Sequence, residues 1–130
     1  MVRERIVAII LRDKKLLLLK GNSPELWSPG GKQEEGETKE QTLRRELQEE
    51  IKLKLKSLKP FKTYFLKNPY NAEQMVRSQC FLVEADGEPK PDNEINSFVW
   101  FSKEDFHNKT YPMIEENEKI VADLIEQELL

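Results

Sequence analysis

The 130-residue chain has a single cysteine, a single histidine and no long hydrophobic run. Cys80 has no second cysteine to pair with, so an intrachain disulfide is excluded and a reducing, cytoplasmic location is favoured. The apolar runs at residues 6–11 and 16–19 are far shorter than the roughly 20 residues that cross a bilayer. The charged N-terminus also argues against a secretory signal. We therefore expect a cytoplasmic protein with no membrane segment, and Cys80 as a small core residue on a strand.

The charges are unevenly distributed. The net charge is −3, with 38% apolar and 35% charged residues, which is typical of a well-solvated globular protein. Residues 34–50 carry seven acids and three bases, whereas residues 51–67 carry six lysines and no acid. General nucleic-acid binding would require a basic domain, so these totals argue against it. The uneven charge distribution is compatible with binding of a small polyanion through a bridging cation. Either a monomer or a homodimer is expected.

The first half of the chain predicts a hairpin, a loop and a helix. The apolar runs on either side of "RDKK" are typical of two paired, central strands. Residues 21–31, rich in Gly, Pro and Asn, indicate a loop. Thr38 and Gln41 form a capping box ahead of apolar residues at every fourth position, which predicts a helix over about residues 39–51.

The second half predicts further strands and a closing helix. The runs at residues 52–58, 61–66 and 75–85 each have strand character, with a turn at "NPYN". Residues 86–94 indicate a loop, residues 97–101 a short strand, and Ser102 a helix N-cap. His107 is expected in a surface loop without a role. The last segment, from Pro112, predicts a helix. This order indicates one domain over residues 1–130, of α+β or three-layer type, with helices covering the faces of a sheet.

Three carboxylates of the predicted helix project together. Glu46, Glu49 and Glu50 lie at positions i, i+3 and i+4, where like charges repel by a few tenths of a kcal/mol. Most acidic clusters on helices are simply solvated surfaces. Here, however, Glu46 and Glu50 flank the apolar stripe, a glycine-rich loop precedes the helix, and Glu37 and Arg45 can pin that loop to it. Converging carboxylates suit a hard divalent cation such as Mg²⁺, which binds a few carboxylates, water and phosphate oxygens.

The same residues carry a resemblance to a known family. Gly31, Glu37 and the run "RELQEEIKL" over residues 45–53 resemble the Nudix box, G-x5-E-x7-R-E-U-x-E-E-x-G-U, where U is a bulky aliphatic residue. Eight of its nine specified positions agree over residues 31–53. The exception is Lys52, where the family has glycine in a left-handed conformation. We expect the helix to end differently here, so that Lys52 avoids that conformation.

The resemblance extends through "LWSPGG" and "NEINSFVWFSKEDF" and implies a fold, an activity and a set of site residues. The implied fold is a Nudix-type α/β/α sandwich around a mixed β-sheet. The implied metal ligands are Glu46, Glu49, Glu50 and the Gly30 carbonyl, for Mg²⁺ with Mn²⁺ as a substitute. Gly31, Glu37 and Arg45 would be structural within the motif. The general base would be Glu46 or, as second choice, Glu94, for which a solvated loop position is the alternative.

The resemblance leaves the substrate open. It implies a MutT-like pyrophosphohydrolase that converts a (deoxy)nucleoside triphosphate to the monophosphate and pyrophosphate. The alternatives are an ADP-ribose or dinucleoside polyphosphate hydrolase and a nucleotide-binding module without turnover. Pro69 and Tyr70 match markers of two different substrates and so decide nothing. Lys20 resembles a phosphate-contacting position, although a strand-end lysine is often solvated. Trp27 could stack on a base or pack under its own loop, and Arg77 could face the site or water.

Overall fold

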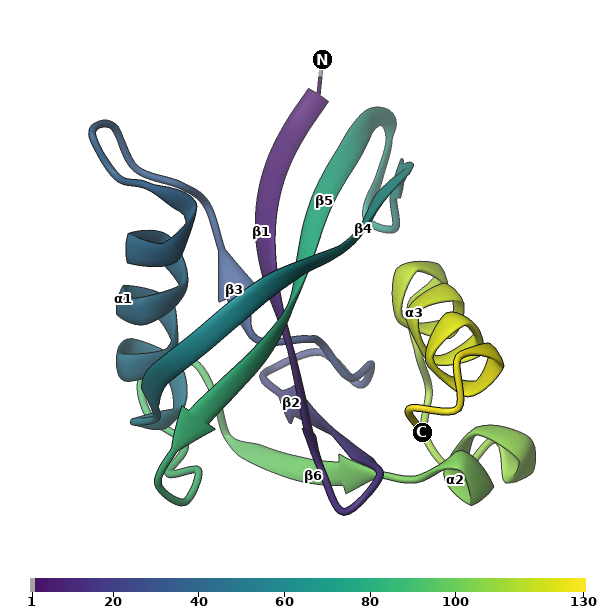
Figure 1. Cartoon of the computed structure of the whole chain (residues 1–130). Coiled ribbons are helices and arrows are strands. Elements are labelled where there is room, and N and C mark those ends of the chain that lie inside the picture. The colour runs from purple at the N-terminus through teal and green to yellow at the C-terminus, as the bar shows by residue number, and fades with distance from the viewer. Residues whose placement is uncertain (1) are drawn as a thin grey trace.

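The computed structural model describes residues 2–130 and shows a mixed β-sheet with helices on both faces (Figure 1). The strands are β1 (Val2–Arg12), β2 (Lys15–Lys20), β3 (Gly30–Gly31), β4 (Lys54–Asn68), β5 (Asn71–Asp86) and β6 (Ser97–Phe101). The helices are α1 (Lys39–Ile51), α2 (Lys103–Asn108) and α3 (Glu115–Glu126). Helix α1 lies on one side of the sheet and α3 on the other (Figure 1). This arrangement confirms the α/β/α sandwich.

Strand β1 lies at the centre of the sheet, whose order is β4-β5-β1-β2-β6 with β3 paired to β1. Strand β1 runs parallel to β5 and antiparallel to β2 and β3, so the sheet is mixed. Alternate β1 side chains enter different cores, because successive residues of a strand point to opposite faces. Ile6, Ala8 and Ile10 pack with α1, whereas Val7 and Ile9 pack with α3. The two faces of one strand thus organise both cores.

The β1–β2 connection is a tight hairpin, as expected from the sequence. Asp13 and Lys14 both have positive φ, at 50° and 57°. Two successive residues of this kind are typical of a type I′ turn, whose twist matches that of the paired strands. Leu11 pairs with Leu16 next to this turn.

The expectation of separate strands at residues 52–58 and 61–66 is wrong, because both belong to β4. The register with β5 shifts between Pro60 and Lys62, so one strand continues through the proline as an irregularity. Strand β4 is the last strand at its end of the sheet. A proline costs an edge strand little, since its missing N–H can face outward. Pro60 therefore marks an irregularity within β4 and not the end of a strand.

Three smaller expectations have mixed outcomes. Cys80 is buried on β5, and burial raises the pKa of its thiol, so it is an unreactive core residue as expected. His107 lies in α2 rather than in a loop, since the capping box of Ser102 and Asp105 begins a helix there. The closing helix begins at Glu115, with Ile114 as its N-cap. No helix within residues 2–130 is long and apolar enough to span a membrane.

Helix α1 begins and ends where the sequence predicts, but its end differs from expectation in conformation. The Thr38–Gln41 capping box is present and Leu43, Leu47 and Ile51 are fully buried. Lys52 adopts the left-handed conformation, with φ 58° and ψ 32°, so the expectation that it avoids this conformation is wrong. Its ammonium group contacts Asp92 at 2.7 Å, and this ion pair helps to hold the strained residue in place.

We predict that Lys52→Gly raises the free energy of unfolding by roughly 1 kcal/mol, because glycine adopts a positive φ without the steric cost of a Cβ. Urea unfolding checks this. Lys52→Ala is the control, since it removes the ion pair with Asp92 but keeps the strain, and it should lower the unfolding midpoint. A lower midpoint for Lys52→Gly as well would show that the ion pair outweighs the strain.

Candidate active site

A cavity of about 950 Å³ lies beside the first half of β1. Its walls come from the first half of β1, the loop at residues 21–32, helix α1, the tip of the β4–β5 hairpin and the start of α3. The acidic side chains lining it include Glu46, Glu50 and Glu94. The basic ones are Arg3, Arg5, Lys32 and Lys67. The cavity has the size of a small-molecule site and carries charges of both signs.

Glu50 faces the cavity from α1 and is anchored to the glycine-rich loop. The N–H of Gly30 donates a hydrogen bond to its Oε1 at 3.1 Å. Pairing of Gly30 with Val7 holds that N–H in place. Burial raises the pKa of Glu50 to about 7, and the nearby Glu46 adds to the rise, although the Gly30 hydrogen bond opposes it. Glu50 is therefore a desolvated carboxylate that a positive charge would stabilise.

Glu46 lies against the other glycine of this loop. A Cβ at Gly31 would displace the Glu46 carboxylate from its present position, so glycine here lets that carboxylate lie against the loop. Arg45 Nη1 donates to Glu46 Oε1 at 2.8 Å. Burial nevertheless raises the pKa of Glu46, because the loss of water outweighs the attraction of Arg45. Gly31 thus allows a carboxylate to approach the backbone of β3.

Glu37 and Arg45 pin the loop to the helix, and the expected pair is present. Arg45 Nε donates to Glu37 Oε2 at 2.7 Å and Arg45 Nη2 to Glu37 Oε1 at 3.0 Å. Glu37 also accepts from the Thr42 hydroxyl and the Glu34 N–H, both at 2.9 Å. The bonds from Arg45 are the main reason that the pKa of Glu37 falls to about 2. Arg45 Nη2 further donates to the Lys32 carbonyl, which fixes the loop beside the cavity.

Glu49 is the most exposed of the three helix carboxylates, with 52% of its side chain accessible and a 3.5 Å contact to Arg45. Within residues 2–130, no three His, Cys, Asp or Glu side chains are already placed to ligate a metal ion. The donor set still fits a divalent cation. Glu46 and Glu50 are hard oxygen donors whose pKa values are raised mainly by burial, so a cation that approached them would stabilise their charged forms.

The remaining predicted site residues lie in different places. Glu94 is exposed and lines the cavity, on the loop before β6. Lys20 is exposed at the end of β2 and does not line the cavity. Arg77 does not line the cavity and pairs with Glu4 on β1. The structure thus brings Glu94 to the site together with Gly30, Gly31, Glu46 and Glu50, but not Lys20 or Arg77.

An aromatic contact joins two segments that line the cavity. Tyr70, at the tip of the β4–β5 hairpin, donates from its hydroxyl to Glu25 Oε2 at 3.0 Å. Its ring lies 6.0 Å from that of Trp27, whose Nε1 donates to the Ser23 hydroxyl. These contacts connect the hairpin to the loop at residues 21–29. Trp27 packs within its own loop and also lines the cavity.

Sequence reasoning missed the four basic residues of the cavity. Arg3 and Arg5 lie two residues apart on β1, so they project to the same face. Their alternation with Val2, Glu4 and Ile6 was the available signal. Lys32 and Lys67 follow no pattern that distinguishes them from solvated lysines.

Comparison with known proteins identifies the family. Residues 2–124 match the NUDIX domain. The chain belongs to the Nudix family. The Nudix fold is also found in solved structures with which the chain shares similarity. One is a protein of Chromobacterium violaceum assigned to the Nudix hydrolase family, with 27% identity, a TM-score of 0.76, and coverage of 97% of this chain and 78% of that one. No curated protein matches the chain.

Two other Nudix structures are similar in fold. A MutT NUDIX hydrolase of Burkholderia pseudomallei has 22% identity and a TM-score of 0.79, covering 95% of this chain and 97% of that chain. The NUDIX domain of Shewanella oneidensis NrtR, in complex with ADP-ribose, has 18% identity and a TM-score of 0.77, covering 98% and 88%. These confirm the expected small MutT-like Nudix fold. As a member of the Nudix family, the protein is a pyrophosphohydrolase. Nudix hydrolases generally use divalent metal ions and bind small nucleotide substrates.

We predict that the Glu37–Arg45 pair stabilises this Nudix domain near neutral pH and that its contribution to the free energy of unfolding is lost at acidic pH. The folded-state pKa of Glu37 lies below its ordinary value of 4.5, so its contribution is complete above pH 4.5 and is lost as the pH falls to about 2. Wild type should be more stable than Glu37→Gln near neutral pH, with the difference shrinking through that window. Urea unfolding over this pH range measures it.

The control for this experiment is Glu35→Gln, which removes an exposed charge from the same loop. Its stability should follow that of wild type at every pH. A gap between wild type and Glu37→Gln that does not change with pH would contradict the assignment.

Proposed function

We propose that this Nudix protein is a cytoplasmic, single-domain, Mg²⁺-dependent hydrolase of (deoxy)nucleoside triphosphates, releasing the nucleoside monophosphate and pyrophosphate. The observation that supports it best is the desolvated carboxylate of Glu50, which accepts a hydrogen bond from Gly30 and lines a cavity of about 950 Å³. A carboxylate in such a position is costly unless a cation approaches it. The basic side chains elsewhere in the cavity complement an anionic substrate.

The metal would be held by Glu46, Glu49, Glu50 and the Gly30 carbonyl, with Mn²⁺ able to replace Mg²⁺. When bound, the cation supplies neutralisation of phosphate oxygens and activation of a water. Gly31 leaves room for the Glu46 carboxylate beside the loop. The Glu37–Arg45 pair keeps this loop in place, so the chain positions its ligands before substrate arrives.

Glu46 is the first choice for the group that accepts the proton of the attacking water. Burial makes it more basic than a fully solvated carboxylate, which favours proton uptake near neutral pH. Glu94 is the second choice or an additional ligand, since it faces the same cavity from the opposite loop. Lys32 is better placed than Lys20 to contact phosphate, because Lys32 lines the cavity.

The cavity of about 950 Å³ is lined not only by the glutamates but also by Trp27 and by Pro69 and Tyr70 at the hairpin tip. A cavity of this size leaves room for a moiety beyond one nucleotide. ADP-ribose and dinucleoside polyphosphates are therefore the alternative substrates. The non-enzymatic alternative is a nucleotide-binding module.

We predict that the protein with Mg²⁺ converts at least one nucleoside triphosphate to its monophosphate and pyrophosphate. The measurement is phosphate release after adding inorganic pyrophosphatase, over a panel that also includes ADP-ribose and diadenosine polyphosphates with added phosphatase. Turnover of ADP-ribose alone would move the assignment to the alternative substrate. Nucleotide binding without any turnover would favour the binding module.

We predict that Glu46→Gln and Glu50→Gln each lower kcat by about 100-fold or more, because each change removes a charged metal ligand. Mn²⁺ binding, followed by electron paramagnetic resonance, should weaken in parallel. Glu40→Gln is the matched control on the same helix, where Glu40 is exposed and pairs with Arg44. Turnover within threefold of wild type for Glu50→Gln would show that the metal assignment is wrong.

A further inference from the structure

Arg5 has a buried donor that the protein itself does not use. Only 12% of its side chain is exposed, and it lines the cavity from β1. Its Nη2 donates to the Ser28 carbonyl at 3.1 Å. Its Nη1 is buried and makes no hydrogen bond within residues 2–130. A buried charged donor without an acceptor is destabilising, so an acceptor supplied by a ligand would be favourable here.

Glu116, in the first turn of α3, lies beside this donor. Its Oε2 is 3.6 Å from Arg5 Nη1, and 10% of its side chain is exposed. At that distance the two groups attract each other but do not form a hydrogen bond. Because Glu116 compensates the charge of Arg5, the pair is poorly suited to a phosphate. It suits a neutral group that can meet a donor and an acceptor side by side.

Trp27 contacts the Arg5 guanidinium and lines the same cavity. The Arg5 guanidinium sits over the Trp27 ring, 5.5 Å from its centroid. Trp27 and Glu116 both line the cavity together with the glutamates of the metal site. We take a nucleotide whose phosphates lie at Glu46 and Glu50 to place its base against Arg5, which lines the same cavity. This step depends on the proposed function.

We propose that Arg5 and Glu116 are specificity-determining residues that read the lactam edge of a nucleobase. Arg5 Nη1 donates to the ring carbonyl oxygen, and the Glu116 carboxylate accepts from the adjacent ring N–H. Guanine, hypoxanthine, uracil and thymine present this edge. Adenine presents the reverse order, an amino donor next to a ring-nitrogen acceptor, which would leave both protein groups unpaired. A site built to hydrogen-bond one pattern strongly rejects the other.

The test compares binding of inosine monophosphate (IMP) and AMP, two purine nucleotides that differ only at this edge. Isothermal titration in EDTA measures binding without metal or turnover, so the result is independent of whether the protein hydrolyses any nucleotide. Wild type should bind IMP about tenfold or more tightly than AMP. Equal affinities would overturn the proposal even if hydrolysis is found. A clear IMP preference would support it even if hydrolysis is absent.

Two variants assign the preference to the pair. Arg5→Met should weaken IMP binding to the level of AMP binding. Glu116→Gln should strengthen AMP binding, because the rotated amide can donate to the adenine ring nitrogen. The Glu116 variant decides the matter if Arg5→Met fails to fold. An unchanged IMP to AMP ratio in a folded variant would overturn the proposal.

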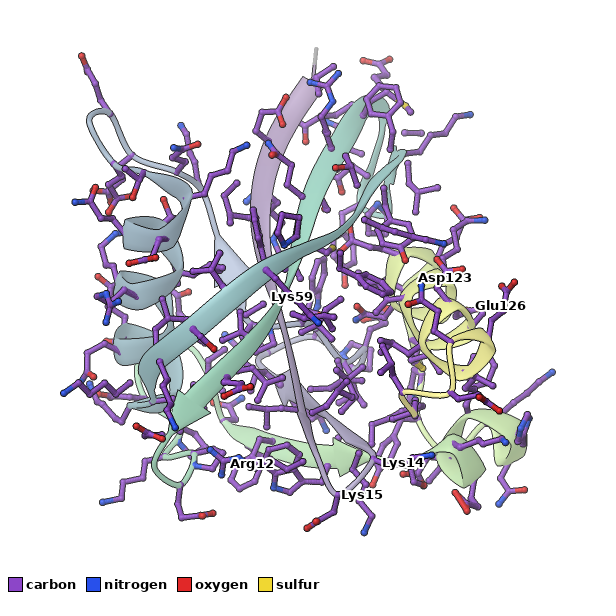
Figure 2. All side chains as sticks on the ribbon, in the orientation of Figure 1. Arg12, Lys14, Lys15, Lys59, Asp123 and Glu126 are labelled. Atoms are coloured by element: carbon purple, nitrogen blue, oxygen red, sulfur yellow. The ribbon has the colours of Figure 1, made fainter. Side chains whose placement is uncertain are left out.

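Arg12→Met is the matched control. Arg12 is also on β1, lies over Trp100 at 5.4 Å and donates to the Ala85 carbonyl at 2.8 Å. Arg12 lies at the end of the sheet near Lys14 and Lys15 (Figure 2). It is not among the residues that line the cavity. Its replacement should leave the IMP to AMP ratio unchanged. A loss of the ratio in Arg12→Met would show that the effect is structural.

Discussion

The positive charge of the Arg45 guanidinium offsets the negative charges of several carboxylates around the site. It lies within 4 Å of four of them, at 2.7 Å from Glu37, 2.8 Å from Glu46, 3.5 Å from Glu49 and 3.7 Å from Glu34. These acids come from both the loop and the helix, so one side chain offsets the repulsion within α1 and also orders the loop. The helix dipole disfavours acids in the last turns of a helix. Because the Arg45 guanidinium is shared among these carboxylates, α1 can nevertheless place several acids there.

The same guanidinium limits how the acids can bind a metal. Glu37 receives two short bonds from Arg45 and is therefore committed to structure, whereas Glu49 has only a long contact. Glu50 receives none and relies on Gly30. The three neighbouring helix glutamates thus differ in availability, although their sequence spacing makes them look equivalent. Arg45 thus holds Glu37 for the loop, gives Glu46 one short bond, and leaves Glu49 and Glu50 without a short bond.

Local signals predicted the fold wherever local physics decides it. The Thr38–Gln41 box and the Leu43 stripe fixed the ends of α1, because capping and burial act within a few residues. Pro60 misled the reading of β4, since only pairing with β5 shows that the strand continues past it. The conformation of Lys52 at the end of α1 was also predicted wrongly, because the ion pair that supports it comes from Asp92, forty residues further along the chain. The spaced motif located the acidic half of the site, whereas Arg5 and Glu116 meet only through the packing of α3 on β1.

The cavity itself follows from how little of β1 is paired on one side. On its β5 side, β1 is paired from Val2 to Ile10. On the other side, β2 pairs only near the turn, and β3 contributes just two glycines, opposite Ile6 and Val7. A side chain at Gly30 would collide with the Ile6 carbonyl, so this short strand can approach β1 only as glycine. The glycines bring the carboxylates of α1 to the open side of β1, where Arg5 projects from the same strand toward α3. An incompletely paired central strand therefore places the acidic and basic halves of the site within one cavity.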